Sequence, residues 1–148
     1  MHDRLAKVSC KALSETLSQL KSDCLLPKTQ SKEGITYAHK LDKQEAQINW
    51  HQKAHEVERN IRGINPFPIA KTQLNQQTIR LFKAQVLESP STKPAGTIVK
   101  VSRDGIDVAC QDHLLRVLEL QMPSRKRLAI FEILNGNTTA FKPGQIFQ

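Results

Sequence analysis

The chain has 148 residues, of which 39% are hydrophobic and 24% are charged, a composition that fits one folded core with shorter segments attached. Twenty-two Lys and Arg residues against 14 Asp and Glu residues give a net charge of +8, so we expect an anionic partner, most often nucleic acid. No stretch of about 18 apolar residues is present, which excludes a membrane-spanning helix, and residues 1–10 lack the apolar run of a signal peptide, which favours the cytoplasm.

Residues 2–22 predict an amphipathic helix with a single apolar face, which needs a surface to lie on. The apolar positions of this helix are Leu5, Val8, Ala12, Leu13, Leu17 and Leu20. Polar and turn-forming residues then predict a linker over residues 25–47, after a first segment of residues 1–24. A short helix over residues 42–48 is a further possibility.

A second helix is predicted to begin at Asn49, a good N-cap, with Gln52 in the place of a capping-box partner. Its apolar stripe consists of Trp50, Ala54, Val57 and Ile61. Gly63 is expected to adopt the left-handed conformation that ends a helix. Pro66 and Pro68 then predict a rigid, extended bend.

The remaining chain alternates apolar and polar residues and predicts strands. The expected strands cover residues 69–74, 78–87, 97–102, 106–110 and 114–122. Residues 75–77 and the pair Asp104-Gly105 predict hairpin turns. Residues 128–134 predict a short helix, and residues 141–147 a tail that can pair as a last strand. The predicted fold is α+β, with a small OB-like β-barrel over residues 48–148, preceded by the linker and amphipathic helices.

Basic residues follow the predicted strands and turns, and residues 124–127 form a compact cationic loop. Three adjacent cations repel one another unless an anion approaches, which favours phosphate binding. Such contacts give affinity and position rather than sequence recognition. The candidate binding residues are Lys40, Lys43, Lys71, Arg80, Lys83, Lys100, Arg103, Arg116, Arg125, Lys126, Arg127 and Lys142.

Other reactive side chains give weaker signals. His51 and His55 have the spacing of metal ligands on one helix face, but no third ligand is near, so two surface histidines are expected. Cys110 shares the inward face of its predicted strand with Ile106 and Val108, so we expect an inert core thiol. The three cysteines include no closely spaced pair, which argues against a disulfide framework. We therefore expect no catalytic and no metal-binding residue.

Six pieces in order, TYAHKL, INW, IRGINPFP, PAGTI, LLRVLELQMPSRKR and ILNG, resemble the C-terminal domain of methionyl-tRNA formyltransferases. The resemblance implies that residues 1–24 correspond to the end of a catalytic Rossmann-like domain, residues 25–47 to an interdomain linker and residues 48–148 to a tRNA-binding OB-like domain. Two turns depart from the family pattern, at Gln111-Asp112-His113 and at the 124–127 loop. The Asn, His and Asp of the family's catalytic domain have no counterpart here.

The resemblance implies a parent enzyme that transfers a formyl group from 10-formyltetrahydrofolate to methionyl initiator tRNA in translation initiation. This part would hold the tRNA through phosphate contacts beside the N-terminal catalytic domain. It would bind no cofactor and would be inactive alone. Two alternatives remain: a structural module of a formyltransferase acting on folates or nucleotide sugars, without RNA contact, and a decayed gene product without function.

Overall fold

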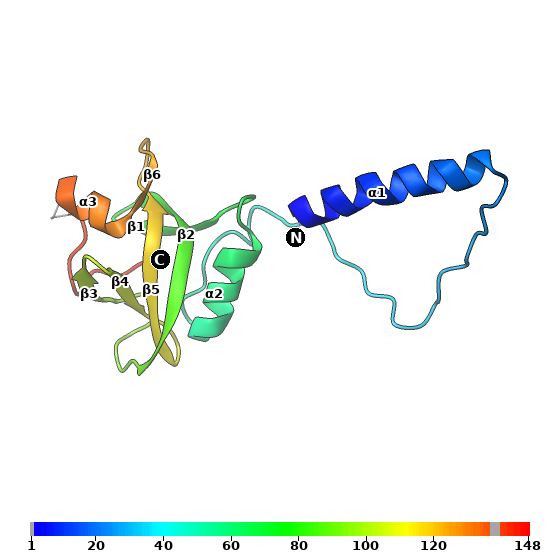
Figure 1. Cartoon of the computed structure of the whole chain (residues 1–148). Coiled ribbons are helices and arrows are strands. Elements are labelled where there is room, and N and C mark those ends of the chain that lie inside the picture. Colours follow the sequence, from blue (N-terminus) through cyan, green and yellow to red (C-terminus); the bar gives the residue numbers. More distant parts are fainter. Residues whose placement is uncertain (1, 137–139) are drawn as a thin grey trace. The chain divides into compact units, whose positions relative to one another are not determined.

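The structure is a computed structural model that describes residues 2–136 and 140–148 (Figure 1). It divides into two compact units, Met1–Ala38 and His39–Gln148. No helix in the described ranges is both long and apolar enough to cross a membrane.

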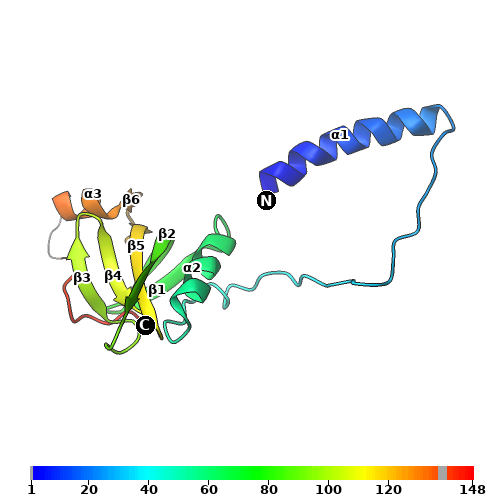
Figure 2. The same cartoon turned by 60° about the horizontal axis from the view of Figure 1, so that its bottom comes forward.

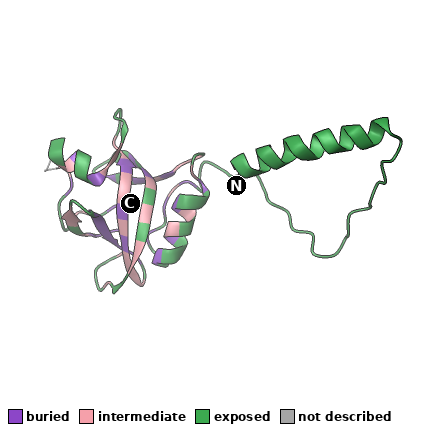
Figure 3. Ribbon diagram, viewed as in Figure 1, coloured by how far each residue is buried: buried purple, intermediate pink, exposed green. Residues whose placement is uncertain are grey.

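The first unit contains one helix, α1 (His2–Lys21), as predicted. Lys11 and Glu15 form an i,i+4 ion pair on it with 3.9 Å between Nζ and Oε1. Residues 3–21 of the helix are all exposed (Figure 3). Its large apolar side chains are 49–60% exposed at Leu5, Val8, Leu13, Leu17 and Leu20. Residues 24–38 form no helix or strand.

The second unit is built on an antiparallel sheet of six strands in the order β1-β2-β5-β4-β3, with β6 paired to β5 (Figure 2). The strands are β1 (Ala70–Leu74), β2 (Gln77–Pro90), β3 (Ile98–Ser102), β4 (Gly105–Ala109), β5 (His113–Gln121) and β6 (Arg127–Ala129). The α+β class is therefore confirmed. The sheet itself is open, because β1 and β3 lie at its two ends and form no ladder with each other in the described part of the chain.

The C-terminal tail reaches both end strands of this sheet. The backbones of Gln73 and Gln148 exchange two hydrogen bonds of 2.8 and 2.9 Å. The N–H of Phe147 donates to the Gly96 carbonyl at 2.9 Å, and the N–H of Ile98 donates to the Gln145 carbonyl at 2.8 Å. The predicted last strand thus forms only an isolated bridge, between residues 97 and 146, yet the tail spans the opening between β1 and β3.

Both predicted hairpins are present. Leu74 pairs with Gln77, so the first loop consists of two residues, Asn75 and Gln76, whose φ angles are 50° and 65°. In the second hairpin the turn lies one residue earlier than expected, and Gly105 is the first residue of β4. A Cβ on Gly105 would lie 2.6 Å from the Val117 carbonyl oxygen, so the close approach of β5 requires glycine there.

Helix α2 (Ala54–Gly63) begins five residues after Asn49, so the predicted N-cap is wrong. Lys53 is the N-cap, and its N–H donates to the Glu56 carboxylate at 3.3 Å. The Asn49 side chain instead accepts the N–H of His51 at 3.0 Å and stabilises a preceding turn. All four residues of the predicted apolar stripe are buried, and α2 packs on β2 and β5 (Figure 1).

The end of α2 also differs from the prediction. Gly63 is not left-handed, and the helix is closed by the N–H of Ile64, which donates to the Asn60 carbonyl at 3.1 Å. The bend that follows contains two cis peptide bonds, before Pro66 and before Pro68, rather than an extended chain.

Two further short helices were predicted wrongly or in part. Instead of the helix predicted over residues 42–48, residues 44–47 form a single turn, which the N–H of Gln47 closes by donating to the Gln44 carbonyl at 3.0 Å. The backbone of Lys71 on β1 then donates to the Ala46 carbonyl at 2.7 Å and accepts the N–H of Ile48 at 2.9 Å. Pairing with β1 therefore replaces the helix. Over the predicted helix 128–134, the chain first completes β6 and then forms α3 (Ile130–Gly136). The Glu132 carboxylate accepts the N–H of Ala129 at 3.0 Å and caps this helix.

Candidate nucleic-acid interface

The cationic side chains of the second unit differ most in whether a carboxylate already neutralises them. Arg116 on β5 lies opposite Asp107 on β4 and binds it through two hydrogen bonds, of 2.6 Å from Nε and 2.9 Å from Nη2. The hydrogen bond to Asp107 raises the pKa of Arg116 further. Arg116 therefore stabilises the β4–β5 pair, and because the Asp107 carboxylate neutralises its charge, it attracts an external phosphate only weakly.

Arg127 is also occupied within the fold. Its Nε donates to the Glu119 carboxylate at 2.8 Å, and its guanidinium lies over the Phe82 ring, 4.6 Å from the ring centroid. These contacts hold β6 against its neighbours. The three adjacent cations of the 125–127 loop thus do not form one equivalent set.

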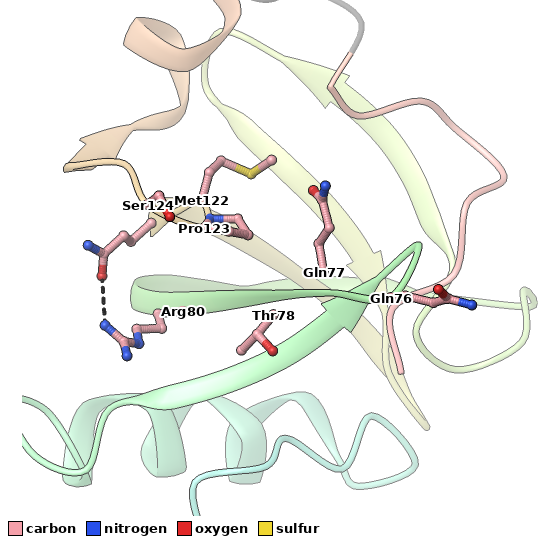
Figure 4. A pocket seen from close by; sticks show the side chains of 8 residues that line it. Gln76, Gln77, Thr78, Arg80, Met122, Pro123 and Ser124 are labelled. Carbon is pink, nitrogen blue, oxygen red and sulfur yellow. Dashed lines mark hydrogen bonds between the residues drawn. The ribbon is translucent and has the colours of Figure 1, made fainter.

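Arg125 and Lys126 are exposed and form no ion pair in the described part of the chain. They line a hollow of about 500 Å³ together with Met122, Pro123 and Glu132. A second hollow of about 370 Å³ adjoins it and shares Gln77, Met122 and Pro123 with it. We call this second hollow the hairpin groove; its lining residues are Gln76, Gln77, Thr78, Arg80, Gln121, Met122, Pro123 and Ser124 (Figure 4).

Gln121 lines the hairpin groove and connects it to Arg125, which lines the other hollow. Its Nε2 donates to the Arg125 carbonyl at 2.7 Å, and its Oε1 accepts from Nη1 of Arg80 at 3.3 Å. The N–H of Arg125 donates to the Met122 carbonyl at 3.1 Å, and Ser124 has a φ of 56°, which closes the loop tightly. One side chain thus holds both the basic loop and the guanidinium of Arg80 in place, and four of the five N–H donors of Arg80 stay unused within the described ranges.

The other predicted cations lie elsewhere on the fold. Arg103 and Lys142 line a separate hollow of about 520 Å³ near Phe141. Lys83 and Lys100 are exposed on β2 and β3. The three remaining members of the predicted set lie at or before β1: Lys40, Lys43 and the half-buried Lys71. Of the twelve predicted residues, the structure brings Arg80, Arg125 and Lys126 together.

The sequence did not single out the polar neighbours of these cations. Gln77, Thr78 and Ser124 line the hairpin groove and are exposed. Their only sequence signal is position, since Gln77 ends the predicted 75–77 turn, Thr78 follows it and Ser124 begins the basic 124–127 loop. Uncharged side chains of this kind are common on any surface, so this position gained meaning only when the fold placed it opposite the 122–126 segment.

A chain of carboxylates and imidazoles lies at the opposite end of β5. One carboxylate oxygen of Glu88 lies 3.0 Å from Nε2 of His55, and the other lies 3.7 Å from Nε2 of His113. Asp112 accepts the N–H of Ala54 at 2.9 Å, which is the main reason that its pKa is lowered to about 2. Asp112 therefore stays ionised and caps α2.

Cys110 is buried at the start of the same turn, as predicted. Burial, with a smaller contribution from Asp112, raises the pKa of its thiol to about 12. The thiol is therefore protonated and unreactive at neutral pH. His51 is exposed, and the described residues contain no group of three His, Cys, Asp or Glu side chains that could hold a metal ion.

Comparisons with known proteins agree on one family. The family described as formyl transferase, C-terminal domain, matches residues 40–138. A methionyl-tRNA formyltransferase from Marinobacter nauticus is 39% identical over 145 residues, which are 98% of this chain and 47% of that protein. One from Legionella pneumophila (strain Paris) is 37% identical over 148 residues, which are 100% of this chain and 47% of that protein. The chain therefore spans about half the length of the curated relatives it matches.

Solved structures show the same fold. The crystal structure of HypX from Aquifex aeolicus in complex with tetrahydrofolic acid has a TM-score of 0.63 and 15% sequence identity, covering 90% of this chain and 24% of that one. A HypX variant reaches a TM-score of 0.64 with the same identity and coverage. At this identity the likeness concerns the arrangement of the elements.

Proposed function

Because the chain belongs to the family of formyl transferase C-terminal domains, we propose that it is the tRNA-binding part of an enzyme that formylates methionyl-tRNA. The observation that carries the proposal is the clustering of Arg80, Arg125 and Lys126 around two adjoining hollows. These cations form no ion pair in the described part of the chain, whereas the nearby Arg116 and Arg127 do. Unpaired cations beside a hollow are suited to the phosphates of a nucleic acid.

In this proposal the second unit holds initiator tRNA while another part of the enzyme performs the chemistry. Phosphate contacts release counterions and fix the position of the RNA without reading its sequence. The formyl group would come from 10-formyltetrahydrofolate, bound by an N-terminal catalytic domain that precedes this chain. Translation initiation takes place in the cytoplasm, which is the location we propose.

We also propose that the second unit has an OB-like architecture in which the tail completes the opening between the end strands. The support is the hydrogen bonding of Gln148 to β1 and of Phe147 to the residues before β3. OB-like folds bind oligonucleotides across a sheet face and its loops, which agrees with the location of the candidate interface.

The test is a titration of the 148-residue chain with initiator tRNA at increasing salt concentration. We expect the logarithm of the binding constant to fall linearly with the logarithm of the salt concentration, by about 0.7–0.9 for each phosphate contact. Arg125→Glu should weaken binding and reduce this slope. Lys93→Glu, an equal change of charge at an exposed residue of the loop after β2, is the matched control. Binding that does not depend on salt would contradict the proposal.

The competing function is a structural module of a formyltransferase that does not touch RNA. It predicts that the folded chain binds no tRNA at low salt and that Arg125→Glu changes nothing. The paired residues Arg116 and Arg127 fit such a module as well as an RNA-binding one, since both contribute to the fold. The unpaired cations are the feature that it leaves without a role.

A further inference from the structure

The hairpin groove contains a polar surface that phosphate binding does not use. We propose that its amides and hydroxyls recognise the 2′-hydroxyls and base edges of RNA, so that the chain prefers RNA to DNA of the same sequence. This inference rests on the proposed function, because it concerns the nucleic acid that the neighbouring cations attract.

The side chains of the groove are uncharged hydrogen-bonding groups for the most part. Three glutamines, one threonine and one serine line it beside Arg80. An amide offers two donors and an oxygen acceptor, and a hydroxyl both donates and accepts. The ribose 2′-hydroxyl also donates and accepts, and it is the group that distinguishes RNA from DNA. The groove is therefore chemically complementary to ribose and base edges rather than to phosphate alone.

These groups are free to bind a ligand. Among the residues that the structure describes, the side chains of Gln77, Thr78 and Ser124 form no hydrogen bond with protein. Gln121 is different, because it already serves Arg80 and Arg125 and so fixes one wall. In the hairpin groove Gln121 is thus fixed by hydrogen bonds, whereas the other three side chains keep their donors and acceptors available for a ligand.

The β-strand sets the spacing of the groups. Ile79 and Leu81 are buried in the core, so Thr78 and Arg80 project from the other face of β2. Residues two apart on one face are separated by about 6.6 Å along the strand. The guanidinium of Arg80, which would position a phosphate, and the hydroxyl of Thr78, which would contact a sugar, therefore lie next to each other on one face of β2. Figure 4 shows both side chains on the β2 side, across from the 122–124 segment.

The opposite wall suits a nucleotide. Met122 and Pro123 border both hollows and give an apolar surface against which a sugar or base can pack. The hairpin groove contains no carboxylate, so it offers a divalent cation no anionic ligand. An acidic peptide would satisfy the cations but would leave most of the amides and hydroxyls without a matched partner. RNA can contact the cations through its phosphates, the amides and hydroxyls through its 2′-hydroxyls and base edges, and the apolar surface through its sugars and bases.

The experiment compares a short RNA hairpin with a DNA hairpin of the same stem sequence, using the full chain at one salt concentration. Wild-type protein should bind the RNA more tightly. Thr78→Val removes a hydroxyl from an exposed side chain, and we expect the RNA affinity to fall about three- to tenfold, the loss typical of one hydrogen bond, while the DNA affinity stays unchanged. Gln77→Ala is a second variant with the same expectation.

Three controls isolate the groove. Thr92→Val and Gln85→Ala make the same chemical changes at exposed positions outside it and should alter neither affinity. Thr78→Ser keeps the hydroxyl and should retain the preference for RNA. Retention by serine and loss by valine would attribute the preference to the hydroxyl rather than to packing.

The outcomes separate this inference from the proposed function. Equal losses of RNA and DNA affinity, or no loss at all, in Thr78→Val and Gln77→Ala would overturn the inference while leaving salt-dependent tRNA binding in place. Competition by polyglutamate that is as strong as competition by RNA would also overturn it, in favour of an acidic protein partner. If the wild-type chain binds neither hairpin nor tRNA, the proposed function and the inference both fail.

Discussion

Asp107 on β4 and Arg116 on β5 are direct cross-strand partners, and the carboxylate and guanidinium meet through two parallel hydrogen bonds of 2.6 and 2.9 Å. Asp107 is only 4% exposed, and Arg116 is partly buried. An ion pair in this setting is sensitive to the loss of one partner, because the remaining charge is left without compensation.

We therefore expect Asp107→Ala to lower the free energy of unfolding by roughly 3–5 kcal/mol, as typical for breaking a buried pair. The measurement is denaturant unfolding followed by circular dichroism. Adding Arg116→Met to Asp107→Ala should recover most of the loss, because it removes the unpaired charge and keeps the packing volume. If the double variant is as unstable as Asp107→Ala alone, the pair is not the cause.

A contrast between neighbouring residues tests which cations face the ligand. Arg127→Ala removes a partner of Glu119 and a contact with Phe82, so it should reduce stability by about 1 kcal/mol, as expected for a partly exposed pair, and hardly change tRNA binding. Arg125→Ala should do the reverse: tRNA binding weakens and its salt dependence falls by about 0.7–0.9, the value of one phosphate contact, while stability stays the same. The same variants serve as each other's controls. Equal effects of both changes on tRNA affinity would show that Arg127 also contacts the RNA.

Local features of the fold were predictable from the sequence. A turn at residues 75–77 was predicted because these polar residues lie between two strand-like segments, and the structure confines it to Asn75 and Gln76. The start of α2 was not, because the group that binds its first N–H is Asp112, 58 residues away. The helix therefore begins where a tertiary contact with Asp112 caps it, and not at Asn49, where the local sequence predicted an N-cap.

The candidate site shows the same limit of local reasoning. Arg116, Arg125 and Arg127 were predicted alike from the sequence, as cations for phosphate contact, although Arg116 lies in an apolar strand segment and the other two lie in the basic 124–127 loop. Their roles differ because strand register places Asp107 opposite Arg116 and lets Glu119 reach Arg127. Register depends on the whole sheet, so the division into paired and unpaired cations needed the structure.

Because the pKa of Asp112 is lowered in the folded protein, the free energy of unfolding should depend on pH in the acid range. The N–H of Ala54 and that of His113 hold the pKa at about 2, below its ordinary value of 3.8. A lowered pKa means that the stabilisation is complete above about pH 4 and is lost as the pH falls from there towards 2. Unfolding measured from pH 5 to pH 2 should show this loss. Asp112→Asn should reduce stability at pH 7 and flatten the acid limb, whereas Asp104→Asn, in an exposed turn, should keep it. An unchanged acid limb in Asp112→Asn would contradict the assignment.

The single tryptophan reports on the contact between β1 and the tail. Its Nε1 donates to the Thr72 hydroxyl at 3.0 Å, that hydroxyl donates to the Gln148 carbonyl at 2.8 Å, and the ring stacks on Phe147 with 5.6 Å between centroids. Thr72→Val removes both hydrogen bonds in a buried place and should reduce stability by about 1–3 kcal/mol, with a shift in tryptophan fluorescence. Thr97→Val is the matched control, because the buried Thr97 hydroxyl has no hydrogen-bond partner among the residues that the structure describes, and it should be neutral or stabilising. A larger loss in Thr97→Val would refute this account of the two hydroxyls.

The division into two units predicts that the second one folds without the first. Its core is formed by residues from Ala46 onward, and the compact unit begins at His39. A chain lacking residues 1–38 should therefore unfold cooperatively with the midpoint of the full chain.

Removing the exposed leucines of α1 should reduce self-association, because each large apolar side chain left in water forgoes roughly 1.5–3 kcal/mol of burial. Leu13→Ser with Leu17→Ser in the full chain separates the two effects, since it should reduce association without shortening the protein. Loss of the cooperative transition in the shortened chain would show that α1 contributes to the core, and formylation of methionyl-tRNA by the 148-residue chain alone would contradict the assignment of the chemistry to another domain.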